Sequence, residues 1–294
     1  MKNVCNKKSF FNLSSPFRGT GGGTSFASIP KNNCMFIPIG DDNRDRRTTP
    51  YINYLFIIIN VLVFIFLQDF GRNWRFTFAY ATVPAEILTG EDYVTRSKVL
   101  RDVLTGQTID MPGLQPTNIP VYLTLITSMF MHGGLAHIIG NMLFLMVFGD
   151  NIEDAMGHAR YFFFYLLCGV LASLSHVFAS YYLGQSIYIP SLGASGAISG
   201  VLGAYILLFP TKGVHMWVFW FIVTLPAFLA VGIWFVFQII NGLGMLGGEE
   251  AAGGVAYAAH IGGFVFGLLL VKLFVKRRRV EKVRRLIEKR KMRW

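Results

Sequence analysis

Long apolar runs separated by short polar segments dominate the sequence from residue 51 onward. Six of these runs approach the ~20 residues that an α-helix needs to cross a bilayer. They cover residues 51–69, 134–150, 159–182, 194–210, 215–240 and 255–275. The pattern predicts an all-α membrane protein built as a six-transmembrane-helix bundle.

The segments around these runs define the predicted domain organisation. Residues 1–34 are polar and contain GTGGGTS, which predicts a disordered N-terminal tail; Met35 is an alternative start that would leave this tail untranslated. Residues 35–275 form the predicted membrane domain, with a long first loop at 70–118, and residues 276–294 form a basic cytoplasmic tail. The semi-apolar run VYLTLITSMFMHGG after the loop predicts a re-entrant or interfacial segment.

Composition supports a membrane location and sets the predicted orientation. Charged residues make up 15% of the chain, against roughly 25% in soluble domains. Twelve of the 27 Lys and Arg residues lie from Lys272 onward, and eight precede Tyr51. Basic blocks at both ends of the membrane domain place both termini in the cytoplasm, and they favour contact with anionic lipid over nucleic acid. The three Cys residues lack metal-ligand spacing, so we expect no metal and no cofactor.

Four polar side chains stand at the starts of three of the runs. His137 opens the second run and is followed four residues later by Asn141, Ser195 opens the fourth, and His260 lies near the start of the sixth. In a six-span topology these three runs cross in the same direction, from outside to inside. The four side chains are therefore expected at one face of the membrane and at a similar depth.

Their chemistry is that of nucleophilic catalysis. A serine becomes reactive when a histidine takes its proton, and N–H groups at a helix start can stabilise an oxyanion. Each residue alone has a simpler interpretation: an intramembrane Ser or Asn often bonds another helix, and a His at a span end is often interfacial. Ser199 is an alternative nucleophile on the same helix face, one turn deeper.

Glycines accompany the serine and the last histidine. Gly193 and Gly196 flank Ser195, and Gly263 and Gly267 form a G-x-x-x-G pattern one turn below His260. Small residues let membrane helices approach closely. The pattern predicts contact between the fourth and sixth runs, which would bring the serine to the histidine.

The motifs HGGLAHIIGNMLFLMVFGDNIEDAMG, GASGAISGVLGAY and AYAAHIGGFVFG resemble those of the rhomboid intramembrane serine proteases of the common bacterial type. The resemblance covers about residues 35–275 and implies a rhomboid-like six-helix bundle with a short fourth helix that starts in a water-filled cavity. It departs from many members at Leu123-Thr124, where they carry Trp-Arg, and at Ser199, where some carry an aromatic residue.

The resemblance also implies an activity. It maps a Ser–His dyad onto Ser195 and His260, oxyanion-site residues onto His137 and Asn141, and a supporting position onto His132. The implied partners are transmembrane segments of substrate proteins within the lipid bilayer, and the implied location is a bacterial cytoplasmic membrane. The alternative is a catalytically inactive rhomboid-like protein that binds membrane clients.

The fifth run is the predicted gate for substrates. Its outer half, AVGIWFVFQII, contains no ionisable side chain, and Gln238 is its only strongly polar residue. A helix held to its neighbours by dispersion alone can yield at modest cost. Trp234 and Phe235 are the aromatic residues that we expect to hold this gate closed. The resemblance likewise implies a gate at this helix and the loop after it.

Overall fold

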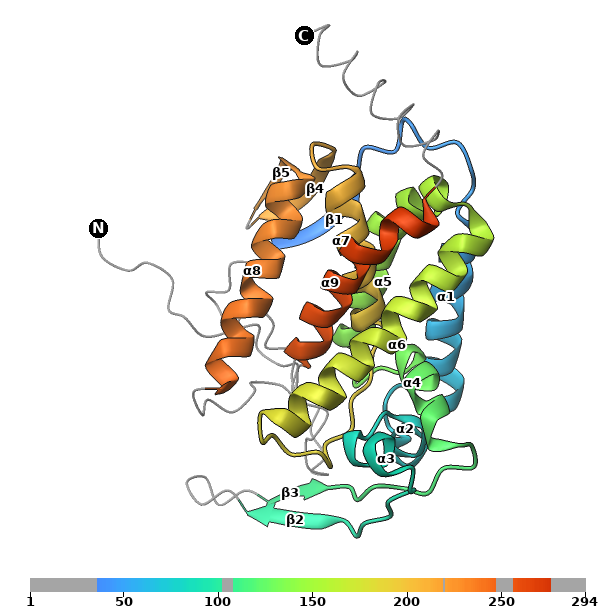
Figure 1. Ribbon diagram of the computed structural model, residues 1–294, viewed down its shortest axis with the longest axis vertical. Helices are drawn as coiled ribbons and strands as arrows, with labels where there is room; N and C mark the ends of the chain where they lie inside the picture. The colour runs from blue at the N-terminus through green and yellow to red at the C-terminus, as the bar shows by residue number, and fades with distance from the viewer. Residues whose placement is uncertain (1–35, 102–107, 219, 247–255, 276–294) are drawn as a thin grey trace, which may run out of the picture.

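The computed structural model describes residues 36–101, 108–218, 220–246 and 256–275. The predicted tails at residues 1–34 and 276–294 lie outside this part of the chain. The centre of the molecule is a bundle of helices, labelled in Figure 1. Its longer members are α1 (Tyr51–Leu62, prolonged by the π-helical turn η1 at Val63–Leu67), α5 (Leu135–Met156), α6 (His158–Tyr182), α7 (Ser195–Leu208), α8 (Ala227–Leu246) and α9 (Tyr257–Phe274).

Three helices of the described chain are long and apolar enough to cross a membrane, namely α5, α6 and α9. The apolar helices at Tyr51–Leu67, Ser195–Leu208 and Ala227–Leu243 are shorter, so helix length does not confirm the predicted count of six. At 1.5 Å per residue, the 14 residues of α7 reach about 21 Å, less than the ~30 Å hydrocarbon core. A helix of this length is too short to cross such a core by itself.

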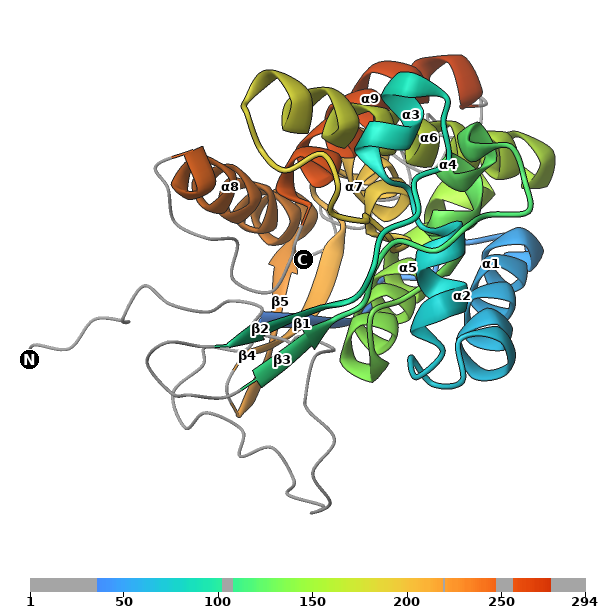
Figure 2. The same ribbon diagram turned by 90° about the horizontal axis from the view of Figure 1, so that it is seen from below.

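Helix α7 occupies the centre of the bundle, and its sequence explains this position. Seen from below in Figure 2, it lies among α5, α6, α8 and α9, and it contacts all four. Every residue from Gly196 to Tyr205 is buried. These residues are small or apolar on all sides of the helix, as expected of a helix without a solvent-facing stripe.

The predicted fifth span is wrong at its start, and the fold is not all-α. Residues 213–226 form a hairpin of β4 (Gly213–Val218) and β5 (Phe221–Pro226), and α8 begins only afterwards. Strand β1 (Phe36–Asp41) pairs antiparallel with β4, which gives a three-stranded sheet in the order β1-β4-β5. The hairpin is rich in aromatic and β-branched residues, which favour strands, but its continuous apolar character resembles that of a helix.

The long first loop forms short elements at the end of the bundle where α7 and α9 begin (Figure 1). These elements are α2 (Trp74–Tyr80), α3 (Pro84–Thr89), β2 (Lys98–Arg101) and β3 (Thr108–Met111), the last two paired antiparallel. The run that we expected to be re-entrant or interfacial forms three consecutive helical turns. They are η2 (Val121–Leu123), α4 (Thr124–Thr127) and η3 (Ser128–Phe130).

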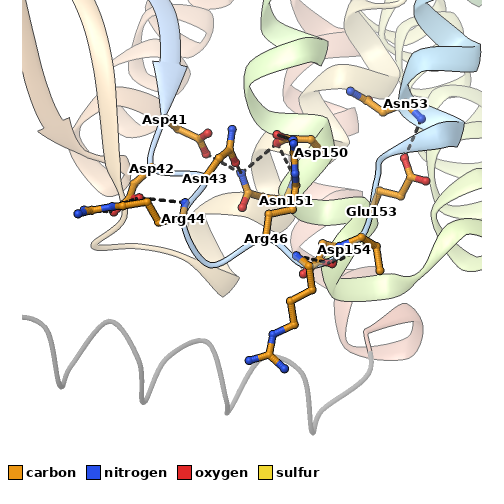
Figure 3. A network of polar contacts seen from close by, with 12 residues as sticks. Asp41, Asp42, Asn43, Arg44, Arg46, Asn53, Asp150, Asn151, Glu153 and Asp154 are labelled. Carbon is orange, nitrogen blue, oxygen red and sulfur yellow. Dashed lines mark hydrogen bonds and ion pairs between the residues drawn. The ribbon is translucent and has the colours of Figure 1, made fainter.

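A polar network at the opposite end, shown in Figure 3, ties the segment before α1 to the end of α5. The Glu153 carboxylate accepts the backbone N–H groups of Ile52 and Asn53 at 3.0 and 2.7 Å, and so satisfies donors at the start of α1. Arg46 pairs with Asp150 at 2.5 Å. This network fixes the bundle at the end remote from Ser195.

Asp41 and Lys212 extend this network to the sheet and to the end of α7. Asn151 donates to an Asp41 carboxylate oxygen at 2.7 Å, Tyr205 donates to the same oxygen, and Lys212 donates to the Asn151 side-chain oxygen. Burial raises the pKa of Asp41 to about 7, and the nearby Lys212 opposes this shift. Side chains therefore link strand β1 to α5 and α7, and β1 in turn pairs with the β4–β5 hairpin.

Candidate active site

The segment before α7 is held in place by the first loop and by the short helical turns. Ser191 and Thr82 exchange backbone hydrogen bonds of 2.8 and 3.0 Å, and the Gly193 N–H donates to the Ser128 carbonyl at 2.9 Å. Gly193 has a φ of +125°, a conformation that side chains with a Cβ rarely adopt. The chain then turns directly into α7 at Ser195.

Ser195 and His260 meet at the starts of α7 and α9. The hydroxyl oxygen of Ser195 lies 2.8 Å from Nε2 of His260, a hydrogen-bond distance. Both side chains are half-buried. No side chain caps the start of α7, so the first N–H groups of that helix lack intrahelical acceptors close to the serine.

Glycines bring the two helices together. A Cβ on Gly263 would lie 2.2 Å from the Gly196 carbonyl oxygen, and one on Gly267 would lie 2.1 Å from that of Gly200. On the facing side, a Cβ on Gly203 would lie 2.3 Å from the Phe264 carbonyl oxygen. The backbones of α7 and α9 are thus in contact along two turns below Ser195 and His260.

His137 borders the same point from α5. Its Nδ1 accepts the Gly133 backbone N–H at 3.3 Å, which leaves the ring proton of the neutral imidazole on Nε2. A Cβ on Gly193 would lie 3.0 Å from that Nε2 and 3.6 Å from the Ser195 hydroxyl oxygen. The N–H donor of His137 and the serine hydroxyl therefore both border the space that a side chain at Gly193 would fill.

Asn141 and Ser199 differ in how their polar atoms are satisfied. The Asn141 side-chain nitrogen is buried and has no acceptor among the described residues. The Ser199 hydroxyl donates to the Ser195 carbonyl at 2.6 Å. The deeper serine is thus bonded within its own helix, whereas Ser195 is bonded to the histidine.

His132 contacts His137, and its backbone is bonded by Gln68, a residue without a predicted role. The two rings meet edge to face with centroids 5.1 Å apart, and neither ring nitrogen of His132 has a partner among the described residues. The Gln68 side chain accepts the His132 backbone N–H and donates to its carbonyl, both at 2.9 Å. The available signal was a lone amide at the end of the first apolar run.

Gln238 on α8, which stood out in the sequence only as a polar residue in an apolar run, contacts His260. Its side-chain oxygen lies 2.7 Å from Nδ1 of His260, and the side chain is only 5% exposed. The prediction that dispersion alone holds this helix is therefore wrong. Trp234 lies beside His260 with ring centroids 6.0 Å apart, and Phe235 stacks on Phe264 at 4.0 Å.

The assembled groups have the geometry for acyl transfer. A hydroxyl faces an imidazole nitrogen at hydrogen-bond distance, and N–H donors from His137 and from the start of α7 lie close to that hydroxyl. Within the described residues, no cluster of three or more His, Cys, Asp or Glu side chains is arranged to hold a metal ion. The contact between the hydroxyl and the imidazole allows nucleophilic attack assisted by a base.

The Rhomboid domain family matches residues 120–277. Rhomboid protein 1, mitochondrial, of Saccharomyces cerevisiae is 31% identical over 216 residues, which cover 74% of this chain and 51% of that protein. The chain thus spans about half the length of this relative.

Two further relatives match over shorter segments. Rhomboid protease GluP of Bacillus subtilis is 35% identical over 146 residues, 49% of this chain and 24% of that protein. The human presenilin-associated rhomboid-like protein, mitochondrial, is 31% identical over 153 residues, 50% of this chain and 36% of that protein. Each match covers a minor part of the relative.

Proposed function

The chain belongs to the rhomboid family, and on this premise we propose that it is an intramembrane serine endopeptidase. Its proposed substrates are membrane proteins, cleaved within transmembrane helices near their extracytoplasmic ends. The observation that carries the proposal is the 2.8 Å contact between the Ser195 hydroxyl oxygen and Nε2 of His260. A named protease, GluP, is among the relatives.

The proposed reaction proceeds through an acyl-enzyme. The Ser195 hydroxyl attacks the scissile carbonyl carbon while Nε2 of His260 takes its proton. The tetrahedral intermediate then collapses, the C–N bond breaks, and His260 returns the proton to the leaving amine. Water enters, loses a proton to His260 and attacks the ester carbonyl. The collapse of the second intermediate releases the new carboxyl end and restores the serine hydroxyl.

The proposed oxyanion site is formed by Asn141, His137 and the start of α7. The Asn141 amide nitrogen is a buried donor with no acceptor among the described residues, and the Nε2–H of His137 faces Gly193 beside the serine. Preorganised donors of this kind stabilise the negative charge that develops on the carbonyl oxygen. His132 supports His137 through the ring contact between them.

The second candidate is a rhomboid-like protein that binds membrane clients without cleaving them. The hydrogen bond between Ser195 and His260 favours the protease, because a binding protein has no need of a base on a serine. The two candidates differ in one measurable property, covalent reaction at Ser195. The first experiment therefore addresses that reaction.

The proposed location is a membrane that the protein crosses several times, with both termini on the inner side. The basic residues that flank the membrane domain in the sequence support this orientation. The yeast and human relatives carry the word mitochondrial in their names, whereas GluP comes from a bacterium. A mitochondrial membrane is thus a second proposed location, in addition to the bacterial cytoplasmic membrane expected from the sequence. Cell fractionation distinguishes the two locations.

The test uses the purified full-length protein in detergent. A fluorophosphonate probe should label wild type, and a model transmembrane substrate should be cleaved. Ser195→Ala should abolish both reactions, because it removes the nucleophile. His260→Ala should reduce both reactions nearly to zero, because it removes the base that activates that nucleophile. The double variant should be no worse than Ser195→Ala alone.

Ser199→Ala is the matched control one turn below. It removes a hydroxyl that bonds the Ser195 carbonyl, and it should keep most of the labelling. Labelling that survives Ser195→Ala and disappears in Ser199→Ala would move the nucleophile one turn down. Wild-type protein that is folded, unlabelled and inactive on every transmembrane substrate tried would favour the client-binding function.

A further inference from the structure

A neutral amide from α8 is bonded to the base of the proposed dyad. Gln238 lies within an otherwise apolar stretch of α8, and its side-chain oxygen is 2.7 Å from Nδ1 of His260. The other nitrogen of the same ring, Nε2, is 2.8 Å from the Ser195 hydroxyl. One imidazole thus bridges two helices, α8 through Nδ1 and α7 through Nε2.

The chemistry of this bridge selects one form of the imidazole. An amide oxygen only accepts hydrogen bonds, so the proton of neutral His260 is held on Nδ1. Nε2 then carries a lone pair directed at the serine hydroxyl, which is the form that a general base requires. In the other tautomer Nε2–H would point at the serine and could take no proton from it.

We propose that Gln238 is the positioning residue of the dyad, which fixes the tautomer and orientation of His260 and makes them depend on the packing of α8 against α9. This inference rests on the proposed protease function. In a serine–histidine–aspartate triad a buried carboxylate has this role. Here an amide supplies the acceptor without placing a charge among apolar side chains, where an ion is costly.

The surroundings of the ring leave Gln238 as the group that fixes its rotation. Trp234 and Tyr257 flank the imidazole with ring centroids 6.0 and 6.4 Å away, and apolar contact of this kind limits the ring plane but does not choose between its two nitrogens. The other titratable groups that interact electrostatically with the His260 ring are His137 on α5 and His176 on α6. A hydrogen bond is directional and does make that choice.

The bond also gives α8 a part in the reaction. If α8 moves away from α9, the amide leaves Nδ1, and the imidazole can rotate or exchange tautomers. The base is then oriented only while α8 is packed. Displacement of α8 by a substrate would therefore have to be followed by its return before Ser195 can attack.

The test compares two substitutions of Gln238 with a control on the same helix. Gln238→Met keeps the length of the side chain and removes the amide oxygen, whereas Gln238→Glu keeps an oxygen acceptor. Asn241→Met removes an exposed amide of α8 whose nitrogen donates within its own helix, to the Phe237 carbonyl. For each variant we would measure fluorophosphonate labelling rate, kcat and KM for a transmembrane substrate, and thermal stability.

The expected pattern separates positioning from structure. An aspartate that orients a catalytic histidine can contribute about 10⁴-fold to kcat, so a neutral amide should contribute less, on the order of 10–100-fold. Gln238→Met should lower kcat and the labelling rate by that factor with little change in KM. Gln238→Glu should restore labelling and move the acid limb of the pH–rate profile to higher pH, since a carboxylate stabilises the imidazolium. Asn241→Met should match wild type.

Three outcomes would overturn the inference. The first is a Gln238→Met variant with the labelling rate and kcat of wild type. The second is a fall in these two rates that Asn241→Met shares. The third is a Gln238→Glu variant whose rates fall as far as those of Gln238→Met and whose pH–rate profile is the same as that of wild type. If Gln238→Met does not fold, the comparison of Gln238→Glu with wild type decides by its pH profile. Failure of the protease function is distinguishable, because it would leave wild type itself unlabelled.

Discussion

The side-chain amide of Asn141 is buried, and its nitrogen has no acceptor among the described residues. A buried donor without a partner costs roughly 1–3 kcal/mol of folding free energy, and such groups are scarce in native proteins. The unpaired donor lies on α5 one turn after His137, whose Nε2 lies beside Gly193. An acceptor that exists only during the reaction, the oxyanion, would satisfy it.

We therefore expect Asn141→Ala to lower kcat by roughly 10–1,000-fold with a smaller rise in KM, because an oxyanion donor acts chiefly in the transition state. His137→Ala should act in the same sense but less, since backbone N–H groups of α7 share the task. The measurement is steady-state cleavage of a transmembrane substrate. Asn60→Ala is the control, because that buried amide donates to the Phe56 carbonyl within α1 and should affect stability alone.

An effect of Asn141→Ala on KM alone would make this residue a binding or packing group. The same conclusion would follow if its loss of kcat merely tracked a loss of stability to the extent seen in Asn60→Ala.

Sequence reasoning could not find the side chains that bond to His132 and His260, but it could bring Ser195 and His260 together. The two stand at the starts of runs that cross in one direction, so topology alone brings them to one depth. Gln68 and Gln238 act through contacts that depend on how each helix is rotated about its axis and on which neighbour it packs against. Periodicity does not fix that rotation in runs that are apolar on every side.

At the scale of elements, the contact between α7 and α9 positions Ser195 and His260. The carbonyl oxygens of Gly196 and Gly200 on α7 lie where a Cβ on Gly263 or Gly267 would have to fit, at 2.2 and 2.1 Å. No real Cβ contact is so short, so any side chain at these positions must force the helices apart. The obstructing atoms are backbone, which has less freedom to adjust than the end of a side chain.

Gly267→Ala should therefore lower thermal stability and proteolytic activity together, and Gly267→Leu should do so more strongly. The changes are measured by thermal unfolding in detergent and by substrate cleavage. Gly232→Ala on α8 is the matched control, because a Cβ there would have no neighbour within 4 Å and alanine is the better helix former. Activity that falls while stability is unchanged would contradict the close-packing argument.

The hairpin of β4 and β5 was not predicted from the sequence. Apolar run length suggested one helix from residue 215 to 240, but Gly213 and Pro226 bound the two strands. The aromatic and β-branched residues between them are the signal that favours strands. The pairing of β4 with β1 joins segments more than 170 residues apart, and no local pattern predicts such a partner.

For the whole molecule, the two ends of the bundle differ in how they are held. The polar network of Figure 3 secures α1, α5 and the sheet at one end. At the other end, the dyad lies where α7 and α9 begin, beside the short elements of the first loop (Figure 1). The contacts between the described residues of α8 and α9 include the hydrogen bond from His260 to Gln238 and the aromatic contacts of Trp234 and Phe235 with Phe264. Helix α8 is the element that we expect to yield to a substrate helix.

Phe235→Ala should accordingly raise cleavage of membrane-embedded substrates, because it removes the stack on Phe264 and leaves Gln238 in place. A small fluorophosphonate should react with Ser195 at nearly the wild-type rate, since it needs no displacement of α8. Trp234 is the less suitable position for this change, because its ring also flanks His260. The measurement is the ratio of the two rates, which should increase in Phe235→Ala.

Tethering α8 should have the opposite effect. The Trp234 ring lies 6.4 Å from that of Phe144 on α5, so cysteines at these two positions, in a chain with its native cysteines replaced, can be joined by a short reversible thiol cross-linker. Cross-linked protein should label with the small probe as the reduced protein does, but it should cleave transmembrane substrates more slowly until the tether is cut. The reduced form of the same variant controls for the loss of Trp234.

Equal cleavage with and without the tether would exclude access past α8 and would direct the search to the segment from Gly242 to Gly254, most of which lies outside the described residues. The outcome bears on Gln238 as well, because a tethered α8 keeps the amide at Nδ1 and should leave the base correctly oriented.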